Sequence, residues 1–161
     1  MKKQSDIVTV VEKEVSRQTD EVMTQLKERC VGIERIRIIL PLPPRILSPN
    51  CPIASFRGRM MRAAAAKKQK RIAKESAEDA MRGERWQKAS VKAIFYCKTK
   101  RRRDSLNFLS ELKASIDGIV EAGLIPDDDS EHLLVDGAEF RIDKEWPRVE
   151  LIFTRREHEN K

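Results

Sequence analysis

The sequence has few aromatic residues and no long apolar run, and each absence narrows the range of functions. Aromatic side chains make up only 5% of the 161 residues, so we expect no extended platform on which single-stranded bases stack. No stretch approaches the roughly 20 consecutive apolar residues that a bilayer-spanning helix needs. The first residues lead into a polar helical pattern without the apolar core of a signal peptide. We therefore expect a cytoplasmic protein with no membrane partner.

Cysteine is also too sparse for the common structural sites. Cys30, Cys51 and Cys97 are far apart in the chain, form no CxxC pair and have no histidine near them. This spacing argues against both a disulfide framework and a zinc site, and it predicts three plain thiols that are mostly buried. The glycine-rich nucleotide-binding motifs and the metalloprotease and serine-hydrolase motifs are absent as well.

Positive charge is what the sequence has in excess, and it is concentrated in the middle of the chain. Eleven basic residues and no acidic residue lie from Arg35 to Lys74, and eight more without an acid lie from Arg85 to Arg103. Residues 104–161 reverse this balance, with fifteen acids against seven bases. Solvated helix faces are one explanation, but a polyanion-binding surface explains the clustering better, because clustered lysine and arginine release counterions from phosphates.

The hydrophobic patterns predict helices and strands in an order typical of one α+β domain. Helical spacing and good helix formers predict helices over 5–29, 58–82 and about 105–121. Alternation and β-branched residues predict strands over 34–40, 91–97, 132–135, 138–142 and 148–154. Asp136-Gly137 gives a weak hairpin signal, and the proline-rich stretch 41–52 predicts a loop. We expect a single small α+β domain with a mixed β-sheet, two main helices and an extra N-terminal helix.

Carboxylates flank the helix expected over 105–121. Asp104 stands directly before it, and Asp127, Asp128 and Asp129 form an acidic turn after it. Three consecutive aspartates repel one another, and oxygen ligation of a hard cation such as Mg²⁺ relieves that repulsion. An isolated acidic turn is usually just solvated, but the basic residues beside these carboxylates also suit an enzyme that grips a phosphate backbone while metal-bound water attacks it.

The most specific motif of the chain is the helix end DGIVEAG over 117–123 with the Asp127-Asp128 turn after it, and weaker motifs accompany it. RRDSLN over 102–107 precedes LKASIDGIVEAGLIPDD over 112–128, and a proline-rich LPLPP over 40–44 lies upstream of SPN at 48–50. Together these segments resemble the RusA family of Holliday-junction resolvases, found in bacteria and their prophages. The resemblance covers roughly residues 34–154. It implies an N-terminal helical extension over 1–30 and a RusA-like endonuclease domain over 31–161.

RusA-type enzymes are homodimeric, Mg²⁺-dependent endonucleases that nick opposite strands of a four-way DNA junction. The resemblance therefore implies a homodimer, branched DNA as partner, and Mg²⁺, with Mn²⁺ able to substitute. Carried over by position, the implied metal ligands are Asp104, Asp127 and Asp128, and the implied catalytic residues are Asp104, Asp128 and Lys113. The expected DNA-binding residues are basic, with one asparagine: Arg57, Arg59, Lys67, Lys68, Lys100, Arg101, Arg102, Arg103 and Asn107. The setting would be the cytoplasm of a bacterium or of a phage-infected host.

The chain departs from the family pattern at one position. The family shows R-D-x-D-N at this helix start, and Leu106 stands where the second aspartate belongs. Either another acid compensates, or the protein has lost cutting activity and kept DNA binding. Glu111 is two helical turns, about 10 Å, beyond Asp104, so the turn aspartates are the better substitutes. A third alternative is a structural or regulatory protein whose basic middle binds an acidic protein surface.

Lys113 and Phe56 each have a functional and a structural interpretation. Lys113 lies nearly opposite Asp104 on a helical wheel, so a snorkelling surface lysine is the alternative to a catalytic one. Phe56 lies beside Arg57 and is a candidate for stacking at an opened junction, although core packing is the commoner role. We expect both tryptophans to be packing residues.

Overall fold

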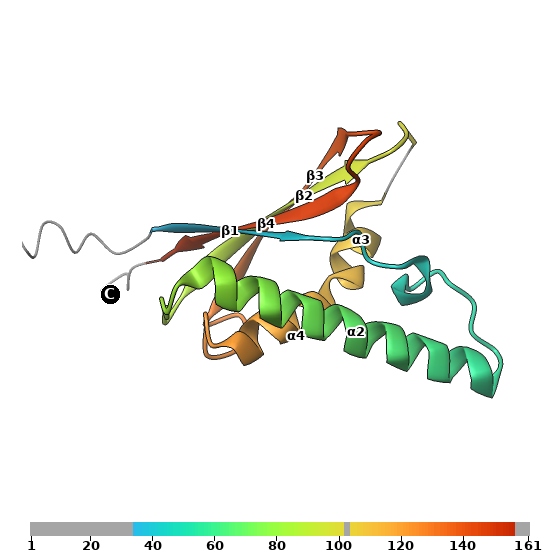
Figure 1. Ribbon diagram of the computed structural model, residues 1–161, viewed down its shortest axis with the longest axis horizontal. Helices are drawn as coiled ribbons and strands as arrows, with labels where there is room; N and C mark the ends of the chain where they lie inside the picture. Colours follow the sequence, from blue (N-terminus) through green and yellow to red (C-terminus); the bar gives the residue numbers. More distant parts are fainter. Residues whose placement is uncertain (1–33, 102–103, 157–161) are drawn as a thin grey trace, which may run out of the picture. The chain divides into compact units, whose positions relative to one another are not determined.

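The computed structural model describes residues 34–101 and 104–156, which form a mixed four-stranded sheet with helices packed on one face (Figure 1). The strands are β1 (Arg35–Leu40), β2 (Ala89–Cys97), β3 (Leu133–Ile142) and β4 (Arg148–Arg155). Their order is β1-β4-β2-β3; β4 is antiparallel to both neighbours, and β2 is parallel to β3. The expected α+β class is confirmed. The expected helix over 5–29 and the extension over 1–30 lie outside the described residues.

The helices are α2 (Phe56–Met81), α3 (Ser105–Glu111) and α4 (Lys113–Ala122), and a short 3₁₀ helix, η1 (Arg45–Leu47), lies in the proline-rich loop. α2 begins at Phe56 because the Ser55 hydroxyl caps it, accepting the Gly58 N–H at 3.0 Å. The single helix expected over 105–121 is wrong: Leu112, with ψ near −8°, separates α3 from α4.

The hairpin expected at Asp136-Gly137 is also wrong. β3 runs without interruption and pairs in parallel with β2. Its register shifts at this point, because Val135 pairs with Val91 whereas Ala138 pairs with Ala93. The dipeptide therefore forms a β-bulge, and the positive φ of 102° at Gly137 suits glycine.

The core lies between the sheet and the helices, and alternate strand residues supply it. Its largest fully buried side chains include Ile38, Leu40, Phe95, Ile119, Leu124, Leu151 and Phe153. Phe108 fixes α3 to the sheet, since its ring lies 5.0 Å from that of Phe95 and 5.1 Å from that of Phe140, both edge-on. Cys97 and Trp86 are buried, as expected; Cys51 is half-buried, and Cys30 lies outside the described residues.

α2 and α4 cross closely at Gly118. A Cβ at this position would lie 2.2 Å from the backbone oxygen of Lys70 and 3.1 Å from the Cβ of Ala73, so only glycine allows the contact. The Gln69 amide donates to the Ser115 hydroxyl at 3.2 Å in the same buried layer. The buried residues of α2 all lie in its second half: Gln69, Ala73, Ala77 and Met81. The first half of α2 therefore contains no buried residue.

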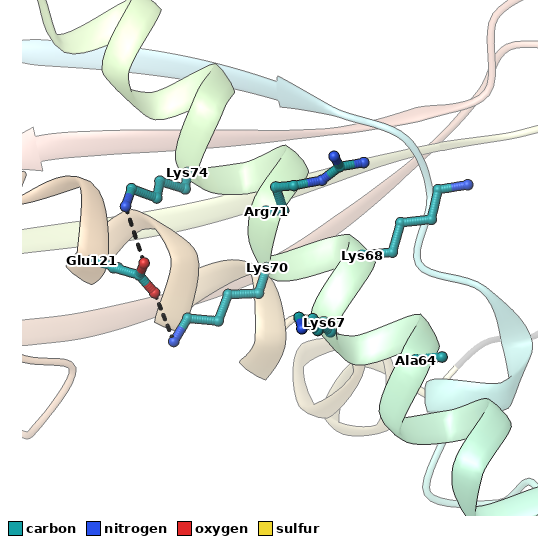
Figure 2. Close-up of a pocket in the computed structure, with 7 residues that line it drawn as sticks. All are labelled: Ala64, Lys67, Lys68, Lys70, Arg71, Lys74 and Glu121. Atoms are coloured by element: carbon teal, nitrogen blue, oxygen red, sulfur yellow. Dashed lines mark hydrogen bonds and ion pairs between the residues drawn. The ribbon is translucent and has the colours of Figure 1, made fainter.

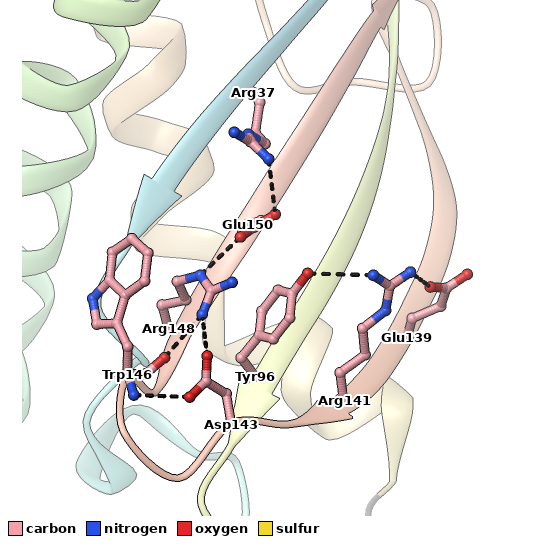
Figure 3. A network of polar contacts seen from close by, with 8 residues as sticks. All are labelled: Arg37, Tyr96, Glu139, Arg141, Asp143, Trp146, Arg148 and Glu150. Carbon is pink, nitrogen blue, oxygen red and sulfur yellow. Dashed lines mark hydrogen bonds and ion pairs between the residues drawn. The ribbon is translucent and has the colours of Figure 1, made fainter.

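The other face of the sheet carries a network of ion pairs (Figure 3). Arg148 is at its centre and donates to Asp143 and to Glu150 at 2.7 Å each. The guanidinium also lies over the rings of Tyr96, at 3.7 Å, and Trp146, at 4.3 Å. Trp146 is exposed, and its ring packs against Arg148 and not in the core.

Within residues 34–101 and 104–156, no helix is both long enough and apolar enough to cross a membrane.

Candidate nucleic-acid interface

The first two thirds of α2 expose positive charge without any acid. Residues 56–74 contain eight lysines and arginines and no aspartate or glutamate. Arg57 and Arg59 are exposed in the first turn, and Lys67, Lys68 and Arg71 are exposed further along. These five residues are called the basic α2 face below.

A groove of about 790 Å³ runs beside this face (Figure 2). It is lined by Ala64, Lys67, Lys68, Lys70, Arg71, Lys74 and Glu121. Lys70 and Lys74 reach towards Glu121 of α4 and contact its carboxylate at 2.9 and 3.0 Å, whereas Lys68 and Arg71 point away from it (Figure 2). Hydrogen bonds from Lys70 and then Lys74 lower the pKa of the Glu121 carboxyl to about 2.

The cations of the basic α2 face are bound far more loosely than Lys70 and Lys74. Arg71 lies 3.9 Å from Glu75, with both side chains exposed, and such a pair contributes little. Lys67 and Lys68 have no carboxylate partner among the described residues. Their charges remain in water, available to an anionic ligand.

Arg62 differs from its basic neighbours because it is structural. Its guanidinium donates to the backbone oxygens of Ile46 at 2.8 Å and Ser48 at 2.7 Å, and so ties α2 to the proline-rich loop. Gly58 allows a close contact with the loop at the same end of α2, because a Cβ there would lie 2.9 Å from the Ile53 side chain.

The second basic segment lies in the loop that joins β2 to α3. Lys98, Lys100 and Arg101 are exposed there. Arg102 and Arg103, also expected to bind DNA, lie outside the described residues. This loop leads directly into Asp104, at the start of α3.

Asp104 caps α3 with both of its carboxylate oxygens. Oδ1 accepts the backbone N–H of Leu106 at 3.0 Å, and Oδ2 accepts the side-chain amide of Asn107 at 3.0 Å. Asn107, expected to contact DNA, is thus held beside Asp104 by its side-chain amide. Leu106 is exposed beside this cap.

Lys113 and Asp128, both expected to be catalytic, are brought together. The Lys113 ammonium pairs with Asp128 and, at 2.8 Å, with Asp117. Hydrogen bonds to Asp117 and then to Asp128 raise the pKa of Lys113, so the ammonium is held in its charged form. The pair borders an open groove of about 830 Å³ whose other lining residues are mostly apolar: Leu106, Leu109, Ser110, Ile116, Leu133, Val135 and Gly137.

The other turn aspartates serve the turn itself. Asp127 accepts the backbone N–H of Asp128 at 2.7 Å. Asp129 accepts the His132 ring nitrogen at 2.8 Å together with the backbone N–H groups of Glu131 and His132. The His132 hydrogen bond is the main reason that the pKa of Asp129 is lowered.

The predicted metal ligands do not fit a magnesium ion as they are arranged here. In the part of the chain that the structure describes, no three histidine, cysteine, aspartate or glutamate side chains are grouped so as to hold a metal. Asp104 is committed to its cap, and Asp128 already has a cation in Lys113. Glu111 is not a substitute, because it is buried and hydrogen-bonds to Ser48; burial is the main cause that raises its pKa.

Sequence reasoning missed two features of this surface. Glu121 partly neutralises the groove, but its pairing with Lys70 and Lys74 depends on the close helix crossing, which no local pattern indicates. Phe56 and Met60 are exposed at the first turn of α2, where core packing was the commoner expectation for an aromatic residue. Their spacing of four residues on a helix was the available signal.

No protein-family model matches this chain, and no curated protein matches it.

Proposed function

We propose that the protein binds branched DNA, with four-way junctions as its preferred form, and that it is a RusA-like protein acting as a homodimer. The observation that carries the proposal is the acid-free run of eight basic residues over 56–74, whose exposed members form the basic α2 face. Clustered exposed cations bind phosphates because they release condensed counterions. A two-fold dimer suits a junction that is itself nearly two-fold.

The dimensions of α2 support a phosphate-backbone ligand. From Arg57 to Arg71 the helix axis rises about 21 Å, and phosphates on one DNA strand are about 3.4 Å apart along the duplex. Several consecutive phosphates therefore fit along the basic α2 face. The exposed Lys98, Lys100 and Arg101 add positive charge from a second element.

Cutting of the junction is the second candidate function, and the contact between Lys113 and Asp128 at an open groove favours it. Mg²⁺-dependent paired nicks would require Asp104, Asp127 and Asp128 to act together. Because these carboxylates do not form a metal-binding group here, DNA binding by a catalytically impaired relative is the function that the geometry supports best. We expect such a protein to act in the cytoplasm of a bacterium or of a phage-infected host.

The deciding experiment uses a labelled synthetic four-way junction, with Mg²⁺, Mn²⁺ or EDTA. We expect tight binding in EDTA and no nicks with either metal in the natural protein. A Leu106→Asp variant restores the missing family carboxylate, and Leu106→Asn is its matched control.

Each outcome of this experiment separates the two candidates. Paired nicks by the natural protein that need a metal and disappear in Asp128→Asn would establish an enzyme. Nicks only in Leu106→Asp would identify Leu106 as the cause of lost activity. No binding to junction or duplex at low salt would reject the DNA-binding function. Light scattering of the free protein tests the homodimer.

A further inference from the structure

The N-terminal end of α2 carries large apolar side chains on an otherwise basic surface. Phe56 is 71% exposed and Met60 is 57% exposed. They are one helical turn apart, on the same side of the helix. Exposed apolar side chains that lie next to one another make this end of α2 a candidate binding surface.

These apolar residues continue the line of cations along α2. At 100° per residue, an arc of about 60° holds Phe56, Met60, Lys67 and Arg71. Between the apolar and the charged parts lies the run Ala63–Ala66, whose small side chains leave room for another backbone. The helix thus presents apolar side chains at its N-terminal end (the apolar tip), then the small alanines, then Lys67 and Arg71, in one stripe about 22 Å long.

The charge around the tip decides what kind of partner fits it. Arg57 and Arg59 flank Phe56, and the Arg59 guanidinium lies 5.9 Å from the centre of the Phe56 ring. A second copy of α2 would bring the same cations and no acid, so two tips facing each other would repel. A polyanion that also offers flat apolar surfaces satisfies both parts of the stripe. DNA with unstacked bases is such a ligand, because inserted apolar side chains and aromatic rings contact base faces directly.

We propose that Phe56 and Met60 contact unstacked bases at the branch point of the junction, while Lys67 and Arg71 hold phosphates of the adjoining arm. This inference rests on the proposed binding of branched DNA and adds the residues that distinguish a branch from an unbroken duplex. A duplex offers only its phosphates to the stripe. The apolar tip therefore contributes to junction binding and not to duplex binding.

The test compares the natural protein with the double variant Phe56→Ala/Met60→Ala. Dissociation constants are measured in EDTA for a four-way junction and for a duplex of equal length, with 2-aminopurine at the branch point to report unstacking. We expect the double variant to bind the junction roughly tenfold more weakly, to bind the duplex unchanged, and to lose the 2-aminopurine response. Met61→Ala is the control, since Met61 is 55% exposed but points to another side of the helix.

Several results would overturn the inference. Unchanged junction affinity in the double variant is one, and an equal loss for junction and duplex is another. A natural dimer that becomes monomeric on the double substitution, with junction affinity retained, would assign the tip to a second copy of the chain. Failure of the natural protein to bind either DNA would instead reject the proposed function, and it would be seen before any variant is tested.

Discussion

The sheet face opposite the helices and the basic α2 face both carry lysine and arginine, but these side chains have different roles on the two faces. On the sheet, the Arg148 side chain is 12% exposed and is held by Asp143 and Glu150, and Arg37 approaches the same Glu150 at 3.7 Å. On the basic α2 face, Lys67 and Lys68 find no carboxylate among the described residues. The comparison separates cations that hold the fold together from cations whose charge is left for a ligand.

Neighbouring carboxylates account for the difference. On the sheet, Glu139 pairs with Lys92 from β2 and with Arg141 from its own strand, and Glu150 is shared by two arginines. Among the residues that line the α2 groove, Glu121 is the one acid. Total charge in a region therefore says less about ligand binding than the share of it that is already paired.

The largest expected effect follows from removing unpaired charge. Lys67→Gln, Lys68→Gln and Arg71→Gln together should weaken junction and duplex binding at least tenfold at 0.1 M salt, because three phosphate contacts are lost. The slope of log affinity against log salt should fall by up to about three. Fluorescence anisotropy over a range of salt concentrations measures both quantities.

A matched control removes the same charge elsewhere. The exposed side chains of Lys144, Arg155 and Arg156 can be changed to glutamine with the same loss of net charge. Equal weakening in both triple variants would mean that net charge, and not the basic α2 face, governs binding. Unfolding temperatures should differ little, since all six side chains are exposed.

The second prediction concerns the paired side of the comparison. Arg148→Ala should lower the midpoint of thermal unfolding by roughly 5–10 °C, because Glu150, whose side chain is 6% exposed, loses its closest cation. DNA affinity of the folded variant should stay unchanged. Arg141→Ala is the control: its side chain is mostly exposed, so its effect should be small. Similar losses in both variants would contradict a special role for Arg148.

A third, smaller effect follows from converting paired cations into unpaired ones. Glu121→Gln should strengthen DNA binding a few-fold, because it releases Lys70 and Lys74 into the groove and removes one negative charge. Glu131→Gln changes net charge equally at an exposed site in the turn before β3. If both variants gain the same affinity, the release of the two lysines has no part in it.

The smallest effect is the pH dependence of the same contact. Glu121 titrates near 4.5 when unfolded and at about 2 when folded, so the contact stabilises the fold fully above pH 4.5. That stabilisation is lost as the pH falls from 4.5 to about 2, and it is modest because the groups are exposed. Carboxyl NMR titration should give a midpoint near 2, shifting towards 4.5 in Lys70→Ala/Lys74→Ala. An unshifted midpoint in this variant would contradict the assigned cause.

The sequence predicted the elements whose signals are local. Alternation of charged and apolar residues located β1, and a run of good helix formers located α2. Asp136-Gly137 misled because a hairpin turn and a bulge require the same glycine conformation. What distinguishes them is β2, a parallel partner far away in the chain. The break at Leu112 also left no signal, since Leu112 remains buried and the apolar stripe continues through it.

The candidate site could be predicted to a similar degree. Counting charges located the basic surface, but which cations are paired depends on α4 packing beside α2. Asp104 shows a second limit, because an aspartate before a helix has the same appearance as a cap or as a metal ligand. Its hydrogen bonds to Leu106 and Asn107 separate the two only in three dimensions.

The close crossing at Gly118 has a mechanical consequence for α2. Its second half is held against α4 by this crossing. Its first half is attached to the proline-rich loop, where Arg62 donates to backbone oxygens. Between these two attachments, none of the side chains of Ala63–Ala66 is buried, so intrinsic propensity is the main support of the helical shape there. The stiffness of this span therefore determines the position of Phe56 relative to the sheet. Ala65→Gly would therefore make this span of α2 more flexible without changing Phe56 and Met60, the crossing at Gly118 or the charge of the helix.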